Sequence, residues 1–236
     1  MKKTVLVTGA AGGIGRAICR RLGGEGWVLV PTDLSPELAG VVGELEEEGV
    51  AAHPVEANLA TDEALADLAA QLADLPPLEL IVNNAGITRD ARLVNLKEED
   101  VAAVLDVNLG APFRLIAHFA PRMETGSIVN IASRAYLGNF GQFNYSMSKG
   151  GLVGMTRAYA LALAPRIRVN AIAPGLISTE MSMAIPQDVR EKMVAAIPLG
   201  RMGDAAEVAD LVAYLAGPGY ITGEVIVIGG GRSLSR

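Results

Sequence analysis

The sequence of 236 residues contains one cysteine, two histidines and only 4 % aromatic residues. Cys19 cannot form an internal disulfide, and with two histidines it leaves too few nitrogen and sulfur ligands for a zinc site, so we predict no metal centre. Basic runs are missing too. No run exceeds two residues and the net charge is −6, which excludes an electrostatic surface for nucleic acid.

Long hydrophobic runs are absent as well. The uncharged stretch 135–148 contains Asn, Gln, Ser and Tyr, so it does not qualify as a membrane-spanning helix. The apolar start at 5–7 ends at Thr8-Gly9, which favours a strand over a signal peptide. We therefore expect a cytoplasmic protein that neither enters nor binds a membrane.

The sequence is rich in small and aliphatic residues. Hydrophobic residues make up 50 % of the chain and 27 positions are glycine, which is typical of close packing between helices and a sheet. Short β-branched runs alternate with stretches of helical spacing, and this alternation predicts parallel strands joined by right-handed crossovers. The predicted strands are 4–8, 27–31, 51–55, 78–82, 127–131, 168–173 and 225–228. We therefore predict an α/β fold, with residues 1–236 as a single-domain doubly wound (Rossmann) fold around a seven-stranded parallel sheet.

The first predicted strand runs directly into a glycine-rich turn at 8–16, which is followed by a helical pattern. Gly9, Gly13 and Gly15 allow a tight turn and a close approach of the backbone to a pyrophosphate, and the helix N-terminus offers free N–H groups to that anion. A turn needed only for packing is the alternative. Strand, turn and helix occur in the order that dinucleotide binding requires, so the pattern predicts a dinucleotide site.

Asp33 stands at the end of the second predicted strand. A carboxylate there can accept hydrogen bonds from both hydroxyls of the adenosine ribose, and it repels a 2′-phosphate. Gly12 and Leu34 offer no cation to that phosphate, and Arg16 is expected to point into the helix start. We therefore predict that NAD(H) is preferred and that NADP(H) is the less favoured cofactor. The alternative is that Asp33 only caps the next helix.

Tyr145 and Lys149 are four residues apart, so on a helix they share one face. A phenol with an ordinary pKa of about 10 carries protons poorly at neutral pH, and a nearby ammonium lowers that pKa. Ser133 follows the strand 127–131, at the edge where parallel sheets bind ligands. Asn108 is a polar residue within the helical pattern 97–120. An exposed Tyr–Lys pair and a core asparagine that satisfies backbone groups are the alternatives.

These motifs stand in the order and spacing of the short-chain dehydrogenase/reductase family. The chain resembles this family along nearly its whole length, in Thr8-Gly9-x3-Gly13-x-Gly15, Asn83-Asn84-Ala85-Gly86, Ser133, Tyr145-x3-Lys149 and Pro174-Gly175. Within the family it is most similar to the bacterial 3-oxoacyl-[acyl-carrier-protein] reductases, in 86–90, 141–145, 198–201 and 220–224. The resemblance implies an NAD(P)-dependent enzyme that interconverts a ketone and a secondary alcohol.

The resemblance also implies a role for each catalytic residue. Tyr145 would carry the proton to or from the substrate oxygen, and Ser133 would hold that oxygen by a hydrogen bond. Lys149 would bind the nicotinamide ribose and lower the pKa of Tyr145, while Asn108 would position a water that links Lys149 to solvent. The implied cofactor-binding residues are Gly9, Gly12, Gly13, Ile14, Asp33, Asn58, Leu59, Asn84, Ala85, Gly86, Tyr145, Lys149, Pro174, Gly175, Ile177 and Thr179.

Three positions depart from the family pattern. Asn58, followed by Leu59, replaces an aspartate that often grips the adenine, and an asparagine amide oxygen can still act as the acceptor. Gly12 and Asp33 differ from the basic residues by which carrier-protein reductases usually select NADP(H). Gly229 begins a run of three glycines where Asp or Asn usually precedes two glycines, and the sequence offers no functional explanation for this change.

Substrate choice should depend on a lid at about 179–196 together with 134–143. Methionines in the lid could adapt to irregular ligands, although core or interface packing explains them equally well. The predicted function is an NAD(H)-dependent oxidoreductase for a 3-oxoacyl or 3-hydroxyacyl thioester, carried by acyl-carrier protein or CoA. The alternatives are a dehydrogenase of another secondary alcohol (polyol, sugar or cyclic ketone) and a non-catalytic nicotinamide-binding regulator. The resemblance also implies a homotetramer, with 221–231 and 144–163 as candidate interface segments.

Overall fold

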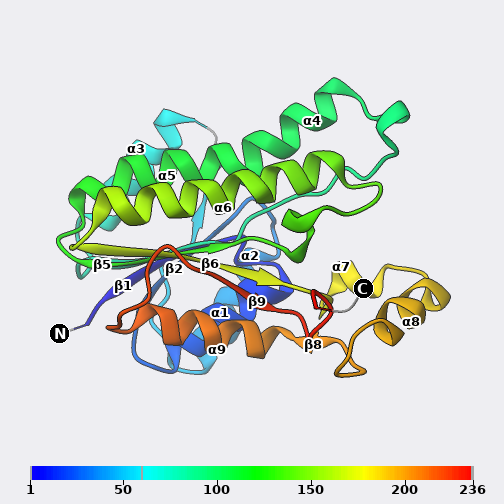
Figure 1. Ribbon diagram of the computed structural model, residues 1–236. Coiled ribbons are helices and arrows are strands. Elements are labelled where there is room, and N and C mark those ends of the chain that lie inside the picture. The colour runs from blue at the N-terminus through cyan, green and yellow to red at the C-terminus, as the bar shows by residue number, and fades with distance from the viewer. Residues whose placement is uncertain (1, 60, 235–236) are drawn as a thin grey trace.

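The computed structural model describes residues 2–59 and 61–234, and at its centre lies a parallel sheet of seven strands in the order β3-β2-β1-β4-β5-β6-β9 (Figure 1). Every neighbouring pair of strands is parallel, so each connection crosses over through a separate segment. The strands are β1 (Thr4–Thr8), β2 (Val28–Asp33), β3 (Val55–Glu56), β4 (Leu78–Asn83), β5 (Gly126–Ile131), β6 (Ile167–Pro174) and β9 (Val225–Ile228). The predicted doubly wound α/β fold with a seven-stranded parallel sheet is confirmed.

Helices cover both faces of this sheet (Figure 1). On one face α1, α2 and α9 share a core with the strands, and on the other face α3, α5 and α6 do the same. The helices are α1 (Gly13–Gly23), α2 (Leu38–Glu47), α3 (Asp62–Leu72), α4 (Glu98–Leu105), α5 (Ala111–Phe119), α6 (Phe143–Leu163), α7 (Glu180–Met183), α8 (Gln187–Ala195) and α9 (Ala205–Ala216). Shorter helical turns are η1 (Leu93–Asn95), η2 (Asp106–Gly110), η3 (Ala120–Arg122) and η4 (Arg134–Leu137).

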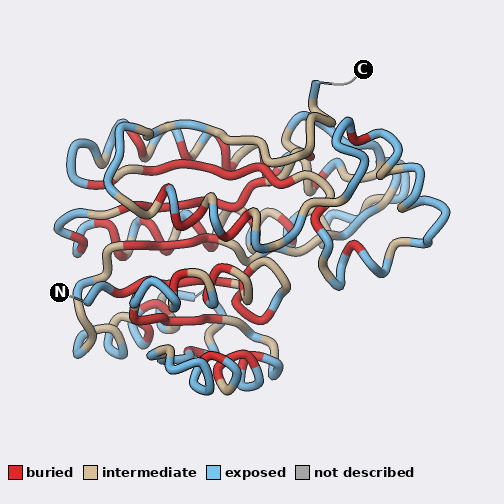
Figure 2. Tube along the Cα trace, turned by 90° about the horizontal axis from the view of Figure 1, so that it is seen from below, coloured by how far each residue is buried: buried red, intermediate tan, exposed pale blue. Residues whose placement is uncertain are grey.

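The central strands are buried on both faces, as the red strands of Figure 2 show. Successive side chains of a strand point to opposite faces. Accordingly Leu6 packs with α3 and α5, while Val7 packs with α1 and α9. A strand buried on both sides needs apolar residues at consecutive positions, and this requirement explains the continuous apolar run of β1.

The strand prediction is wrong in two places. The third strand was predicted at 51–55, but β3 contains only Val55 and Glu56, because Ala52 forms just an isolated bridge with Leu29. A second parallel pair, β7 (Ile177–Ser178) with β8 (Gly203–Asp204), was not predicted at all. Two-residue strands are too short to show a periodicity of two, so the sequence pattern gives no sign of them.

The helical stretch from α4 through η2 and α5 was predicted at 97–120 as one helical pattern. The stretch Glu98–Arg122 contains an 18-residue window with a mean hydropathy of 1.2, so it is long and apolar enough to cross a membrane by length and composition, although no such span was predicted. Leu115, Ile116 and Phe119 of this stretch pack into the core on the sheet. One third of that window is buried within the protein, and length and composition alone are weak evidence for a membrane span.

Beyond the carboxyl ends of the strands lie α7 and α8, beside the last described residues of the chain (Figure 1). Both helices fall within the range 179–196 predicted for the lid. The turn after β9 contacts this segment, because Gly230 adjoins Ile197 and the Arg232 guanidinium donates to the carbonyl oxygen of Met193 at 3.4 Å. The turn after β9 therefore packs against the segment that contains α7 and α8.

Candidate active site

The strand order of the sheet reverses at β1 and β4, which lie side by side although β2 and β3 separate them in the chain. In open parallel sheets the crevice beyond the carboxyl ends at such a reversal is where ligands bind. The glycine-rich turn follows β1 and the loop 84–91 follows β4, so both border this crevice. The N-cap of α1 is Gly12, without a side-chain cap, which leaves the first N–H groups of the helix available to an anion.

Two glycines of the turn are required by close backbone contacts. Gly9 adopts a φ of +65°, and an added Cβ there would lie 2.8 Å from the Cα of Ala85. An added Cβ at Gly15 would overlap the carbonyl oxygen of Gly9. At Gly13 a Cβ would lie 3.1 Å from the Cγ2 atom of Thr179. The structure thus brings Thr179, the N-cap residue of α7, against the turn.

The turn is braced by polar groups from the neighbouring strand ends. The Thr8 hydroxyl accepts hydrogen bonds from the backbone N–H groups of Asn84 and Ala85, both at 3.0 Å. The Asn84 side-chain amide donates to the carbonyl oxygens of Thr8 and Gly9, again at 3.0 Å. Asn84 therefore acts on the shape of the turn. The sequence predicted Thr8 only as part of the glycine-rich turn. Its hydrogen bonds to the residues after β4 hold the turn in place, and such contacts between distant segments are not visible in the sequence.

Asp33 also contacts the turn directly. Its Oδ2 atom accepts a hydrogen bond from the Ala11 N–H at 2.9 Å, and its Oδ1 atom accepts from Leu34 at 2.7 Å and Ser35 at 3.0 Å. A carboxylate can accept about four hydrogen bonds, so one site remains for a hydroxyl. Arg16 donates from Nε to the carbonyl oxygen of Ala11 at 2.9 Å, at the base of the same turn.

Tyr145 and Ser133 come together from different elements. Ser133 is the N-cap of η4, just after β5, and Tyr145 lies in the first turn of α6. The Ser133 hydroxyl is hydrogen-bonded to the Tyr145 phenol, and the pKa of Tyr145 is raised above its ordinary value. Burial raises this pKa most, the Ser133 hydrogen bond lowers it, and the Asp90 carboxylate raises it. A phenol therefore lies beside a hydroxyl at the sheet edge where parallel sheets bind ligands.

Lys149 is buried, with only 3 % of its surface exposed, and its Nζ atom donates to the carbonyl oxygen of Ile131 at 2.8 Å. Its ammonium lies 5.7 Å from the centre of the Tyr145 ring. Burial lowers the pKa of Lys149 from 10.5 to about 8. The resemblance implies that Lys149 lowers the pKa of Tyr145, whereas burial of the phenol is the largest cause here and raises this pKa.

Asn108 lies in η2, a π-helical turn that joins α4 to α5, and is completely buried. Its Oδ1 atom accepts from the Ile87 N–H at 2.8 Å, and its Nδ2 atom donates to the Ile87 carbonyl at 3.0 Å and to the Ser148 hydroxyl at 3.1 Å. An added Cβ at Gly86 would lie 3.2 Å from this Oδ1 and 3.4 Å from the Lys149 Nζ. The Cβ position of Gly86 thus lies close to both the Asn108 side-chain amide and the Lys149 ammonium.

The remaining predicted residues are spread around this centre. Leu59 is buried in the core near α3 and α5, and its carbonyl oxygen accepts from Arg114 at 3.3 Å, so its side chain faces away from the crevice. Ile177 is likewise buried, in the core on the α1 and α9 face. The turn at Gly175 approaches Gly229 so closely that an added Cβ would lie 2.9 Å from the Gly229 Cα.

The residues present fit a dinucleotide. The turn is held open by glycines, the uncapped start of α1 faces it, and the Asp33 carboxylate contacts its backbone. A phenol, a hydroxyl and a buried ammonium gather at the same sheet edge. This fold and this set of groups define a nicotinamide-dependent oxidoreductase that acts on a carbon-bound hydroxyl group.

The comparisons with known proteins agree with this class. A family model described as Enoyl-(Acyl carrier protein) reductase matches residues 9–233, and the chain therefore belongs to the short-chain dehydrogenase/reductase family. It is 42 % identical to the 3-oxoacyl-[acyl-carrier-protein] reductase FabG of Thermotoga maritima over 97 % of each chain. It is 41 % identical to the enzyme of the same name from Staphylococcus aureus over 98 % of each chain.

Solved structures show the same fold in complexes with a cofactor. A blue fluorescent protein from a metagenomic library, in complex with NADPH, has a TM-score of 0.91 and 34 % identity, covering 98 % of this chain and 97 % of its own. The actinorhodin polyketide ketoreductase with NADPH has a TM-score of 0.92 and 33 % identity at the same coverage. This chain is thus an enzyme of the same family that binds a nicotinamide cofactor.

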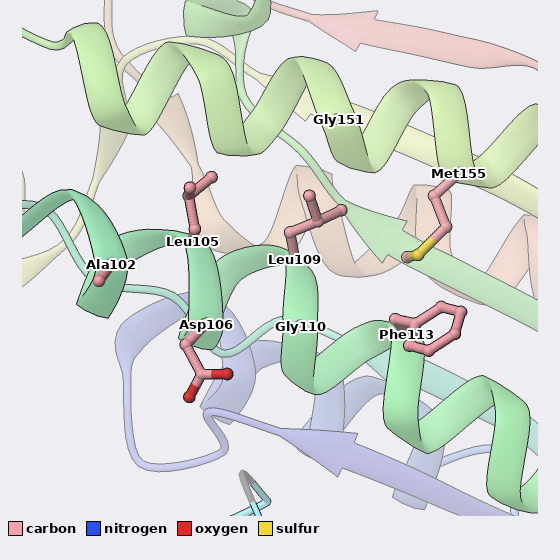
Figure 3. A pocket seen from close by; sticks show the side chains of 8 residues that line it. All are labelled: Ala102, Leu105, Asp106, Leu109, Gly110, Phe113, Gly151 and Met155. Atoms are coloured by element: carbon pink, nitrogen blue, oxygen red, sulfur yellow. The ribbon is translucent and has the colours of Figure 1, made fainter.

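An apolar hollow lies beside η2, the turn that contains Asn108. It has a volume of about 600 Å³ and is bordered by α4, η2, α5 and α6 (Figure 3). Gly110, Gly151, Leu109 and Phe113 are among its lining residues. The helices are close at Gly151, because an added Cβ there would lie 2.8 Å from the Cδ2 atom of Leu109. The half-exposed ring of Phe113 in particular leaves apolar surface uncovered on this side of the molecule.

Proposed function

We propose that this chain is an NAD(H)-dependent oxidoreductase that interconverts a 3-oxoacyl thioester and the corresponding 3-hydroxyacyl thioester. The observation that carries the proposal is the hydrogen bond between the Tyr145 phenol and the Ser133 hydroxyl, with the ammonium of the buried Lys149 5.7 Å from the Tyr145 ring. The names of the relatives support a thioester linked to a carrier protein. CoA is the other carrier that we consider.

In the mechanism, a bound nicotinamide supplies or accepts the hydride. Tyr145 donates its phenolic proton to the ketone oxygen during reduction and accepts it from the alcohol during oxidation. A raised pKa keeps the phenol protonated at neutral pH, ready for reduction. Ser133 donates a hydrogen bond to the same oxygen and fixes its position, and Lys149 holds the ribose and stabilises the phenolate.

Asn108 has a narrower role in this proposal than the resemblance implied. Both protons of its amide nitrogen are donated, to Ile87 and Ser148. The side chain therefore fixes the loop after β4 and the helix that carries Lys149.

The cofactor preference rests on Asp33. Its negative charge at the end of β2 would repel a 2′-phosphate, and its remaining acceptor site suits a ribose hydroxyl. The related structures contain NADPH, so the preference for NAD(H) is the part of the proposal that most needs a direct measurement. Purified enzyme should show a higher kcat/KM with NADH than with NADPH, and the opposite order would refute the preference.

The substrate is tested with a panel. Acetoacetyl-CoA, acetoacetyl-carrier protein and the small acetoacetyl N-acetylcysteamine thioester are compared with a polyol, a sugar and a cyclic ketone, each with both cofactors. The proposal expects the thioesters to have the highest kcat/KM. Faster turnover of the polyol or cyclic ketone would point to another secondary alcohol as the substrate.

Tyr145→Phe separates an enzyme from a nicotinamide-binding regulator. The variant keeps the ring but loses the proton, so turnover should fall by about 10³-fold or more while cofactor binding is retained. Fluorescence titration with NADH measures the binding. A wild-type protein that binds NADH but turns over none of the panel would support the regulator.

We further propose that residues 1–236 act as one cofactor-binding unit with a lid at about 179–196, in a cytoplasmic homotetramer without nucleic-acid or membrane partners. The apolar hollow of Figure 3 and the 85 % exposed side chain of Leu161 support burial of the α6 side between subunits. Light scattering of the wild type should give four times the chain mass. Phe113→Arg should reduce that mass, because a charge would be buried in the apolar contact.

A further inference from the structure

Asn144, the residue before Tyr145, is a completely buried polar side chain that the catalytic assignment does not use. It lies in the first turn of α6, whose N-cap residue Gln142 makes no side-chain capping hydrogen bond. The Oδ1 atom of Asn144 accepts from the Tyr145 N–H at 2.8 Å, and its Nδ2 atom donates to the carbonyl oxygen of Arg89 at 3.0 Å. One amide therefore joins the backbone of Tyr145 to the loop after β4.

This loop, 84–91, is held at several points. Near its middle, both backbone groups of Ile87 are bonded to Asn108. At its far end the N–H of Ala91 donates to the carbonyl oxygen of Gly141 at 3.0 Å, just before α6. The loop is thus a fixed support, and Asn144 is the buried link between that support and the helix that carries Tyr145.

The same loop touches the other end of the catalytic pair. Gly86 lies against the Lys149 ammonium, since an added Cβ there would be 3.4 Å from Nζ. Tyr145 and Lys149 are about one helical turn apart on α6. A shift of the first turn of α6 against the loop would therefore move the phenol relative to both Lys149 and the crevice.

We propose that Asn144 is a positioning residue, which sets the place of the Tyr145 phenol by tying the tyrosine's backbone N–H to the carbonyl of Arg89. The inference rests on the proposed function, because it takes Tyr145 as the proton carrier. A misplacement of about 1 Å can cost about 10²-fold in rate. Loss of the link should therefore act on catalysis more than on substrate or cofactor binding.

The first test compares Asn144→Ala with Thr156→Val. Thr156 is also buried on α6, bonded to Asn130 and to the Leu152 carbonyl, so it reproduces the loss of a buried polar group away from the loop. Asn144→Ala should lower kcat by about 10²-fold and leave KM and the NADH dissociation constant within about twofold. Thr156→Val should keep kcat within about twofold.

A second readout does not require turnover. The ultraviolet titration of Tyr145 is obtained as the difference between each protein and the same protein carrying Tyr145→Phe. Burial is the main cause of the raised pKa of Tyr145, so a loosened first turn should let water in and lower the midpoint by about half a pH unit or more. Thr156→Val should leave the midpoint unchanged.

The outcomes separate this inference from the proposed function. If the wild-type protein does not turn over ketones, the proposed function is refuted, and the Tyr145 titration alone then tests the positioning role of Asn144. With turnover present, a kcat of Asn144→Ala within about twofold of wild type overturns the positioning role. The positioning role is also overturned if the Tyr145 titration midpoint is unchanged in Asn144→Ala, or if Thr156→Val loses as much kcat as Asn144→Ala.

Discussion

The ammonium of Lys149 lies 5.7 Å from the centre of the Tyr145 ring, and its hydrogen bond within the described part of the chain goes to the Ile131 carbonyl. The two residues thus share a helix face without a direct hydrogen bond to the phenol. A buried ammonium beside one carbonyl has spare donors, which suits a group that waits for the ribose of a cofactor. The same burial of the Lys149 charge destabilises the folded protein, and this loss of stability can be measured.

Lys149→Met should raise stability while abolishing turnover. Burial lowers the pKa of Lys149 from 10.5 to about 8, which corresponds to about 3 kcal/mol against the charged form. Because the unfolded chain holds this proton more tightly, the penalty is complete below about pH 8 and disappears as the pH rises towards about 10.5. Thermal unfolding should therefore show the largest gain for the variant near neutral pH. The exposed Lys192→Met is the control, and a variant less stable than wild type at neutral pH would contradict the argument.

Asp90→Asn should move the pH dependence of both reaction directions. The Asp90 carboxylate accepts from the Gln142 amide at 2.8 Å and raises the pKa of Tyr145. Removing its charge should lower that pKa, so alcohol oxidation should begin at lower pH and ketone reduction should decline at lower pH. Profiles of kcat/KM against pH, recorded for oxidation and for reduction, measure both shifts. Asp210→Asn, on the opposite helix layer, should leave them unchanged; identical profiles in all three proteins would show that the Asp90 charge is screened.

Asp33→Ser should shift the cofactor preference towards NADPH. The substitution removes the charge that would repel a 2′-phosphate, and it removes the acceptor that holds the Ala11 N–H. We expect kcat/KM with NADH to fall by about tenfold and the NADH to NADPH ratio to fall with it. Asp33→Asn is the matched variant, since it keeps the shape and loses only the charge. An unchanged ratio in both variants would leave Asp33 as a structural cap of the turn.

Two glycine-to-alanine changes should have opposite effects on stability. At Gly15 the added methyl group would overlap the Gly9 carbonyl, so the free energy of unfolding should fall by about 1–3 kcal/mol. Gly40 is exposed within α2 with open space around it, so alanine there should raise this free energy by about 0.5–1 kcal/mol. Denaturant unfolding measures both. Equal effects at the two positions would mean that the turn relaxes around the methyl group.

The features that the sequence predicted well are local. The spacing of Tyr145 and Lys149 fixes a shared helix face, and glycines before a helical pattern indicate a tight turn whatever the rest of the chain does. The central strands were found because a strand buried on both faces must be apolar at successive positions. Such signals depend on neighbouring residues alone, so periodicity reveals them.

The features that the sequence missed depend on contacts between distant segments. Nothing around Asp33 shows that its Oδ2 will hold the Ala11 N–H, and nothing around Thr179 shows that it will touch Gly13. The π-helical turn at Asn108 adds no visible break to the apolar pattern, so a continuous helix was the natural expectation. Gly229 remains without a structural reason, because an added Cβ there would meet only ordinary contacts, such as Val227 at 3.5 Å.

The contact between the turn after β9 and the segment that contains α8 has a consequence for fusions to this protein. Gly230 and Arg232 touch the segment that contains α8, while β1 starts at the opposite end of the sheet (Figure 1). A bulky fusion joined after Arg232 would press on the segment that contains α8, and one joined before Thr4 would not. Kinetic constants measured with the two kinds of fusion should therefore differ in KM for the substrate, and preparations tagged ahead of β1 are the ones to compare across laboratories.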